Sequence, residues 1–246
     1  MEAVLDEVIE SKIFTRENSQ VTFQSPKAYI QPFLDVVGVD KIICKVQDPV
    51  TNENEDHTRN VAYPRVAIEA HLGNQVTGYD SVVGMVFALN IQNPIIKVYT
   101  GQNAHACTNL TIFNASAVSQ YSLMNDFTDV FRKAEFYMKQ KEAEIKHFIA
   151  TRDKLLNEFY TEEELKNELG RLLLATTKKN SKIGYGAIAG ASKLIQEPDS
   201  IYYLRPGEKL SKMMLYDSIT QHITDSTDIL HKPNKTIAVS QLLGIN

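Results

Sequence analysis

Residues 61–90 read VAYPRVAIEAHLGNQVTGYDSVVGMVFALN, and this stretch decides the fold class. Apolar and polar residues partly alternate over 61–72, a period of two that is typical of a strand. Pro64 within it predicts an edge strand or a bulge, because proline cannot donate a ladder hydrogen bond. Residues 81–90 are apolar on both faces, as in a strand at the centre of a sheet. We therefore expect a β-sheet at this point of the chain.

Further strands are expected on both sides of this stretch. Residues 41–46, KIICKV, are rich in β-branched residues. Lys97–Tyr99 and Thr108–Phe113 follow downstream and complete a mostly antiparallel sheet of four or five strands. Before the sheet, apolar residues at helical spacing predict a helix that begins at Ser25-Pro26 and ends at Gly38.

The chain becomes helical after Ser119. Apolar residues recur at intervals of three, four and seven from Phe127 to Phe159, which predicts a helix of about 35 residues. Thr161-Glu-Glu-Glu164 has the pattern of a capping box and starts a separate helix. Beyond it we expect a break at 176–193, a short strand or extended segment at 199–206, a helix over 208–230 and a last helix at 239–243.

These patterns predict an α+β protein, an antiparallel β-sheet with a long helix and a helical C-terminal region. We divide it into N-terminal helices plus sheet (1–118), the long helix and capped helix (119–175), and a basic glycine-containing linker with the C-terminal helical region (176–246). Residues 1–20 read as a short amphipathic helix, with Val4, Val8 and Ile9 on one side.

Composition excludes several classes of protein. The chain has 246 residues, of which 43% are hydrophobic, so it can bury a core. Its net charge of −4 excludes a protein that is basic throughout, although local basic stretches remain. The N-terminus lacks the basic region of a signal peptide, and no segment is long and apolar enough to cross a bilayer. We expect a soluble, cytoplasmic protein with no membrane partner and no cofactor.

Zinc-ligand residue types occur near the turns of the sheet region. His57, His105 and Cys107 are of this kind, but the chain has no CxxC, HxxxH or HExxH spacing. They remain weak candidates for a metal site. The competing interpretation makes Cys44 and Cys107 small buried thiols, because two cysteines are too few for a disulfide framework.

A metal-dependent phosphodiesterase is a second option for this region. Asp48 and Glu69 could hold Mg²⁺ while His57 acts as general base. The competing interpretation is structural, with Asp48-Pro49 starting a turn and Glu69 lying with His71 on a polar face. We assign no catalytic residue.

The segment TTKKNSKIGYGAIAGASK (176–193) contains four lysines and no acid. It lacks the GK[ST] ending of a P-loop. Glycines expose backbone amides, and lysines beside them suit a nucleic-acid backbone. We predict phosphate contacts from this segment and a base stacked on Tyr185; its lysines are Lys178, Lys179, Lys182 and Lys193. The competing interpretation is a flexible linker.

The long helix carries seven basic residues interspersed with glutamates. In the nucleic-acid interpretation, Arg132, Lys139 and Arg152 line a groove. The competing interpretation is a solvated helix face whose charges pair at i,i+4, and an oligomer interface is a further option.

Several motifs carry a family resemblance. KVQDP (45–49) is followed by a polar insertion and then by HTR (57–59), ACTNL stands at 106–110, and LSKMMLYDSITQHIT at 210–224. This arrangement resembles a phage- and plasmid-borne domain-of-unknown-function family. The chain departs from that pattern at Leu110, where the family has glycine, and at Asp217, where it has asparagine.

The resemblance implies a mobile-element context, and hence the host cytoplasm, but brings no established reaction or catalytic residue. The leading hypothesis is a protein that binds nucleic acid without catalysis, single-stranded DNA above all, and self-associates. Its context would be recombination or counter-defence, by analogy of architecture with oligomeric single-strand annealing proteins. A virion or protein-interaction component and the metal-dependent phosphodiesterase are the alternatives.

Overall fold

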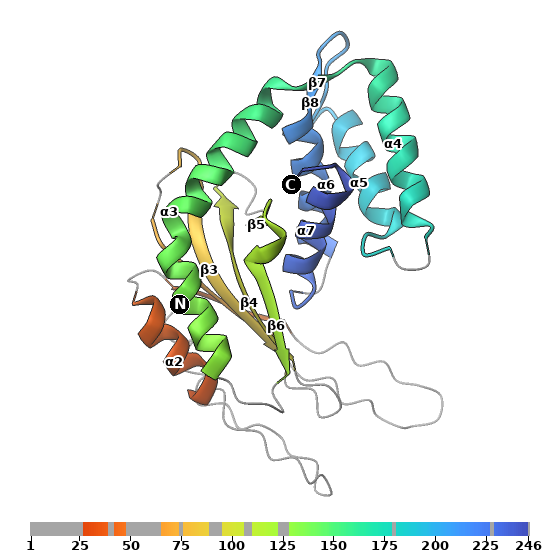
Figure 1. The fold of residues 1–246 in the computed structure, drawn as a ribbon. Helices are drawn as coiled ribbons and strands as arrows, with labels where there is room; N and C mark the ends of the chain where they lie inside the picture. Colours follow the sequence, from red (N-terminus) through yellow and green to blue (C-terminus); the bar gives the residue numbers. More distant parts are fainter. Residues whose placement is uncertain are drawn as a thin grey trace, which may run out of the picture. The chain divides into compact units, whose positions relative to one another are not determined.

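In the computed structural model the described part of the chain consists of residues 27–38, 42–47, 65–73, 76–88, 95–105, 110–122, 128–178, 181–226 and 229–245. These residues form a six-stranded antiparallel sheet, a separate pair of short strands and six α-helices (Figure 1). The predicted α+β class is confirmed. The elements are α2 (Lys27–Val37), β1 (Ile42–Gln47), β2 (Arg65–His71), β3 (Tyr79–Ala88), β4 (Ile95–Ala104), β5 (Leu110–Thr111), β6 (Val118–Ser122), α3 (Thr128–Asn157), β7 (Phe159–Tyr160), α4 (Glu162–Thr176), α5 (Tyr185–Gln196), β8 (Leu210–Ser211), α6 (Lys212–Ser226) and α7 (Lys232–Leu242).

The strands of the sheet follow the chain in the order β1-β2-β3-β4-β5. β6 also pairs with β4, along Ile95–Tyr99, whereas β5 pairs with β4 further on, at Gln102 and Asn103. The predicted central strand is confirmed, because β3 has β2 on one side and β4 on the other. β2 is likewise an interior strand, so the edge-strand option predicted from Pro64 was wrong; Pro64 itself, where the other option placed a bulge, lies outside the described residues.

The chain divides into two compact units, each with its own core. The first takes in the described residues of Met1–Gly73, Val82–Thr100 and Val118–Lys141. The second takes in those of Asn74–Ser81, Gly101–Ala117 and Glu142–Asn246. β3, β4 and α3 each contribute residues to both units.

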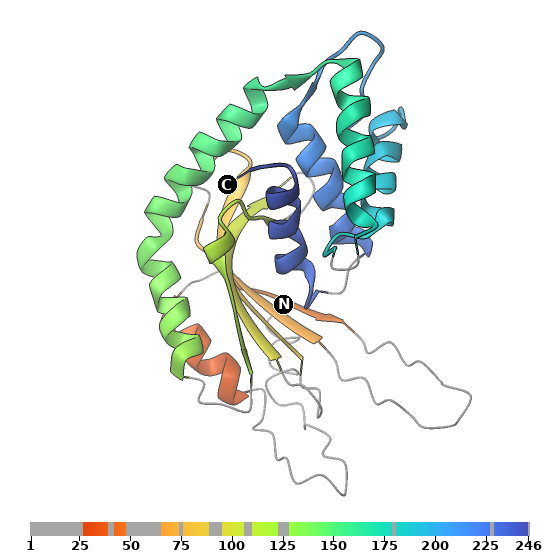
Figure 2. The ribbon, with the colours of Figure 1, turned by 45° about the vertical axis from the view of Figure 1, so that its right-hand side comes forward.

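Alternate residues of the strands form the core of the first unit. Ile68 on β2 pairs with Met85 on β3, and both side chains are fully buried. Phe33 of α2 and Val130 of α3 belong to the same core, and Figure 2 shows α2 beside the N-terminal part of α3. Gly38, at a φ of 52°, ends α2 as predicted, in a backbone region that favours glycine. Burial of each such large side chain stabilises the fold by roughly 1.5–3 kcal/mol.

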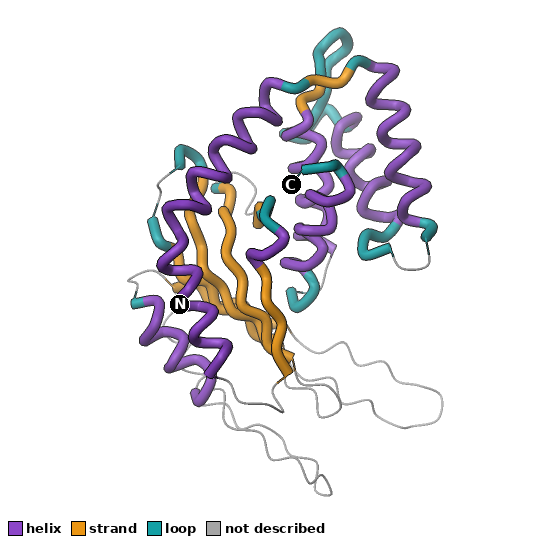
Figure 3. The backbone as a smooth tube through the Cα atoms, in the orientation of Figure 1, coloured by secondary structure: helices purple, strands orange, loops and turns teal. Residues whose placement is uncertain are grey.

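The C-terminal half of α3 and helices α4 to α7 build the second core (Figure 3). Phe148 of α3 stacks on Phe113, the two ring centroids being 5.4 Å apart. Tyr216 of α6 is fully buried, and its hydroxyl accepts a hydrogen bond from the backbone N–H of Ile112 at 3.3 Å. Ser240 of α7 donates to the carbonyl of the same residue at 2.6 Å. Both helices are therefore tied to the segment after β5.

The long helix is shorter than predicted. α3 has 30 residues, because a strand stands before it and another after it. The prediction that the chain becomes helical directly after Ser119 was wrong, because β6 extends to Ser122; this strand has little apolar alternation and owes its form to pairing with β4. β7 pairs with β8, so the helix predicted from residue 208 begins only at Lys212. Residues 199–206 form turns, and the strand predicted there as one option is absent from the described chain.

Residues 185–196 are helical, although their glycines predicted a break. Gly190 faces His222 of α6, and a Cβ at this position would lie 2.2 Å from the His222 Nδ1 atom. Glycine therefore permits α5 and α6 to approach closely, and this packing outweighs its low helix propensity. Ile188 and Ile195 of α5 are buried in the second core, so this part of the segment is no linker.

The capping box is confirmed, since the Thr161 hydroxyl accepts from the backbone N–H of Glu164 and the Glu164 carboxylate accepts from that of Thr161. Among the described residues, no helix has the length and apolar character needed to cross a membrane.

Candidate nucleic-acid interface

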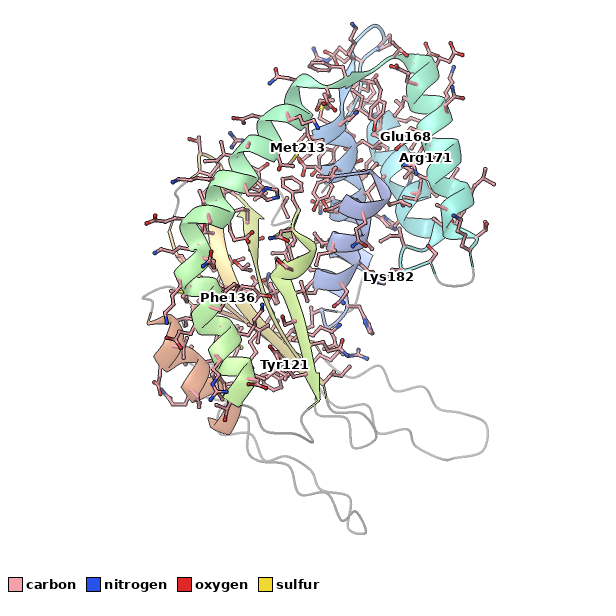
Figure 4. The ribbon with its side chains drawn as sticks, in the orientation of Figure 1. Tyr121, Phe136, Glu168, Arg171, Lys182 and Met213 are labelled. Carbon is pink, nitrogen blue, oxygen red and sulfur yellow. The ribbon has the colours of Figure 1, made fainter. Side chains whose placement is uncertain are left out.

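The turn between α4 and α5 is anchored at both ends. α4 ends at Thr177, whose backbone N–H bonds back into the helix. On the other side Ile183 is buried in the second core, and its carbonyl accepts from the Ser181 hydroxyl at 2.8 Å. Lys178 and Lys182 are exposed within this turn (Figure 4 labels Lys182). Lys179 lies outside the described residues.

Lys178 and Lys182 have no carboxylate partner among the described residues, a property that they share with Lys141 and Lys146 of α3. No ion pair joins either ammonium group to an acid within the described ranges. By contrast, Arg171 of α4 lies 2.6 Å from Glu168 of the same helix (Figure 4). An unpaired exposed cation can engage a phosphate without first breaking an internal contact.

The start of α5 adds backbone donors beside these lysines. Gly184 is the N-cap residue, and no side chain caps the helix there. A Cβ at Gly184 or Gly186 would meet no atom within 4 Å, so the backbone is open to approach at both positions. The N-terminal end of a helix attracts anions through its N–H groups and its dipole. Tyr185, between the two glycines, is 64% exposed.

A pocket of about 280 Å³ opens at the same helix end. Its walls include both glycines together with His222 of α6 and Lys235 of α7. No carboxylate is among its lining residues in the described chain. The sequence pattern did not predict either basic residue, because each is more than 35 positions from the glycines and joins them only through helix packing.

The remaining cations of the predicted interface already face acids. Lys193 of α5 lies 3.2 Å from Glu197, and Lys139 of α3 lies 2.6 Å from Glu135. The second pair holds the pKa of the Glu135 carboxyl below its usual value, chiefly through the hydrogen bond from the lysine.

The two arginines predicted to line a groove belong to different units. Arg132 lies in the first, 3.3 Å from Asp129. Arg152 lies in the second, 2.7 Å from Asp153, with its guanidinium carbon 6.0 Å from the ring centroid of Phe148. The contacts of Arg132 are those of a solvated helix face, whereas Arg152 is half-buried and has a cation–π contribution.

Of the three metal candidates, only His105 belongs to the described residues. His105 Nε2 lies 3.1 Å from Asp80 Oδ1, while His57, Cys107 and Asp48 lie outside the described residues. Within the described part of the chain, no three His, Cys, Asp or Glu side chains converge in a way that could hold a metal ion. Burial raises the pKa of the Cys44 thiol, which keeps it protonated and unreactive at neutral pH.

Glu69 lies beside His71, as the structural interpretation predicted, and both side chains are buried. Glu69 is only 3% exposed, and its Oε1 accepts a hydrogen bond from the Tyr99 hydroxyl at 2.7 Å. Lys45 Nζ lies 3.4 Å from its Oε2. Burial, and then the nearby carboxylate, raise the Tyr99 pKa well above its usual value. Gly84 on β3 leaves room for the Tyr99 ring, because a Cβ at this position would lie 2.2 Å from the ring.

No protein-family model matches this chain, and neither a curated protein nor a solved structure matches it. The resemblance to the phage- and plasmid-borne family therefore remains a prediction that rests on the sequence motifs alone.

Proposed function

We propose that this protein binds nucleic acid without catalysis, through the turn between α4 and α5 and the start of α5. The lysines of the turn contact phosphates, and Tyr185 stacks on a base. The observation that carries the proposal is that Lys178 and Lys182 are exposed and form no ion pair with any acid that the structure describes, next to an exposed tyrosine and a pocket lined by Lys235.

Electrostatics supports phosphate as the ligand. Four lysines and no acid stand between residues 176 and 193, within a chain whose net charge is −4. Binding through such a localised patch releases counterions from the nucleic acid, so its affinity falls with salt. Because the rest of the chain is acidic, it repels the nucleic acid, and binding concentrates at this patch.

Single-stranded nucleic acid suits this surface better than a duplex. An unpaired base presents its flat face to an exposed aromatic ring, whereas the bases of a duplex are already stacked on each other. A role in strand annealing, recombination or counter-defence of a mobile element fits such a protein and extends the same proposal.

Fluorescence anisotropy with a labelled oligonucleotide tests the preference directly. We expect a single-stranded 20-mer to bind more tightly than the same sequence as a duplex at equal salt. Equal affinity for the single strand and the duplex would contradict base stacking on Tyr185. Absence of binding at low salt would overturn the whole proposal.

A protein-interaction role is the second candidate, and exposed apolar side chains favour it. Leu174 of α4 is 71% exposed and Phe136 of α3 is 48% exposed. Such residues contribute to contacts between proteins when they join a larger apolar surface. A stable complex that assembles in the same way with and without nucleic acid would support this candidate.

The metal-dependent enzyme gains little support. Of its three candidate residues only Glu69 is described, and its carboxylate already accepts from Tyr99 and faces Lys45. A carboxylate next to an ammonium group is a poor ligand for a second cation, because the two positive charges repel each other.

A further inference from the structure

A groove of about 710 Å³ lies in the second unit, apart from the surface described above. Its apolar floor comes from three elements, with Leu165 and Leu169 on α4, Ile195 on α5 and Leu210 on β8. Tyr160 and Tyr203 add aromatic walls. Apolar side chains with a few aromatic ones are the usual lining of a site for a peptide or small ligand.

The rim of the groove carries exposed cations. Arg205 and Lys209 line the groove and are exposed. Neither side chain forms an ion pair within the described part of the chain. Glu208 between them accepts a hydrogen bond from the backbone N–H of Arg205 at 3.0 Å. The third rim cation, Lys166, is paired with Glu162 at 2.6 Å.

Two large apolar side chains outside the groove, but near its residues in the sequence, are also exposed. Phe159, next to Tyr160 in the chain, is 51% exposed, and Ile201, close to Tyr203, is 67% exposed. A small ligand seated in the groove would leave both side chains in water. A polypeptide attached to a folded partner can cover the groove and these flanks together.

The chain itself contains a segment whose sequence complements this rim. Residues 1–14 read MEAVLDEVIESKIF, with four acids against one lysine, and lie outside the described residues. Apolar residues recur in it at the three- and four-residue intervals of an amphipathic helix, notably at Leu5, Val8, Ile9 and Ile13. Amphipathic segments bind by placing their apolar side chains in a groove.

We propose that the acidic N-terminal segment of a second copy of this chain docks in the groove, with its acids facing Arg205 and Lys209. The contact joins two different surfaces, one from each copy. If two copies exchange their segments reciprocally, the contact closes a two-fold dimer, whereas docking in one direction from copy to copy generates rings or filaments. The inference does not depend on nucleic-acid binding.

Sedimentation velocity over a concentration series, in the absence of nucleic acid, tests it. The wild-type chain should self-associate. The groove variant Arg205→Glu/Lys209→Glu and the segment variant Glu7→Lys/Glu10→Lys should each weaken association about tenfold or more, because like charges then face each other. The variant that combines all four changes should recover most of the loss.

A misfolded chain could not regain self-association when two more residues are changed. Recovery in the combined variant would therefore show that each double variant lost association through this contact. The double variant Arg132→Glu/Lys139→Glu is the matched control, since it makes the same change in net charge on α3 and should associate like the wild type. A wild-type chain that stays monomeric at every concentration would overturn the proposal. So would association that is insensitive to the reversals, or a combined variant as weak as either parent.

Discussion

The imidazole of His222 occupies the space that a side chain at Gly190 would need, since a Cβ there would lie 2.2 Å from His222 Nδ1. This contact brings α5 and α6 together and places the start of α5 beside the basic residues of α6 and α7.

Gly190→Ala should therefore destabilise the protein although alanine is the better helix former. We expect a loss of about 1–3 kcal/mol in the free energy of unfolding, because the added methyl group overpacks the helix contact. Gly170→Ala on α4 is the control, since a Cβ there meets no atom within 4 Å. It should stabilise by up to about 1 kcal/mol. Urea unfolding of both variants checks the two signs, and stabilisation by both would contradict the close approach of the helices.

Tyr99→Phe should destabilise the first unit by about 1–3 kcal/mol, because the buried Glu69 carboxylate loses its hydrogen bond from the Tyr99 hydroxyl. Tyr137→Phe removes a bond of 3.2 Å between two neutral hydroxyls, the other being that of Ser119, and should cost less. Chemical unfolding followed by circular dichroism compares them. A smaller loss for Tyr99→Phe than for Tyr137→Phe would contradict the buried network.

The burial of the Asp217 carboxyl should make the stability of the protein depend on pH. Burial raises the pKa of this carboxyl from 3.8 to about 7. Below pH 4 the group is protonated in both states and contributes nothing. As the pH rises from about 4 to 7 the unfolded chain releases the proton more readily, so stability falls, and above pH 7 the loss is complete. The full loss is on the order of 4 kcal/mol.

Asp217→Asn should remove this dependence and leave the protein more stable than wild type at pH 8. The unfolding free energy measured at pH 4, 6 and 8 shows whether it does. Asp153, exposed on α3, is the site of the control variant Asp153→Asn, whose stability should follow the wild-type curve. If the difference in unfolding free energy between the wild type and Asp217→Asn did not change between pH 4 and 8, this result would contradict the burial of Asp217.

Tyr185→Ala should weaken binding of a single-stranded oligonucleotide about tenfold, as expected when one stacked base is lost. Tyr185→Phe keeps the ring and should bind like the wild type. The change should appear equally at low and high salt, since stacking releases no counterions. Anisotropy titrations at two salt concentrations measure this, and wild-type affinity in the alanine variant would exclude the stacking role.

Local patterns predicted much of the fold. The capping box at Thr161 and the glycine stop at Gly38 were correct, because both depend on neighbours a few residues away. The sheet was predicted from its β-branched runs. β6 was missed, because its strand form depends on pairing with β4 across the chain.

Less of the candidate site than of the fold could be predicted from the sequence. The lysines of 176–193 were visible as a run, but only the structure shows that Lys178 and Lys182 form no ion pair among the described residues, whereas Lys193 is paired with Glu197. Pairing of Lys139 with Glu135 was foreseeable, because i,i+4 spacing puts the two charges together. The approach of His222 and Lys235 to the α5 start depends on packing between helices, for which the sequence has no local signal.

The measurement that tests the central claim most directly is the salt dependence of single-strand binding. We would compare the wild type with Lys178→Ala/Lys179→Ala/Lys182→Ala by anisotropy across a salt series. Arg132→Ala/Lys139→Ala/Lys166→Ala is the control, since it removes the same charge from cations that are paired with acids on their own helices. The account predicts that the slope of log affinity against log salt falls by about 2 in the first variant, since each phosphate contact contributes about 0.7, and is unchanged in the control. Equal slopes in all three proteins would contradict it.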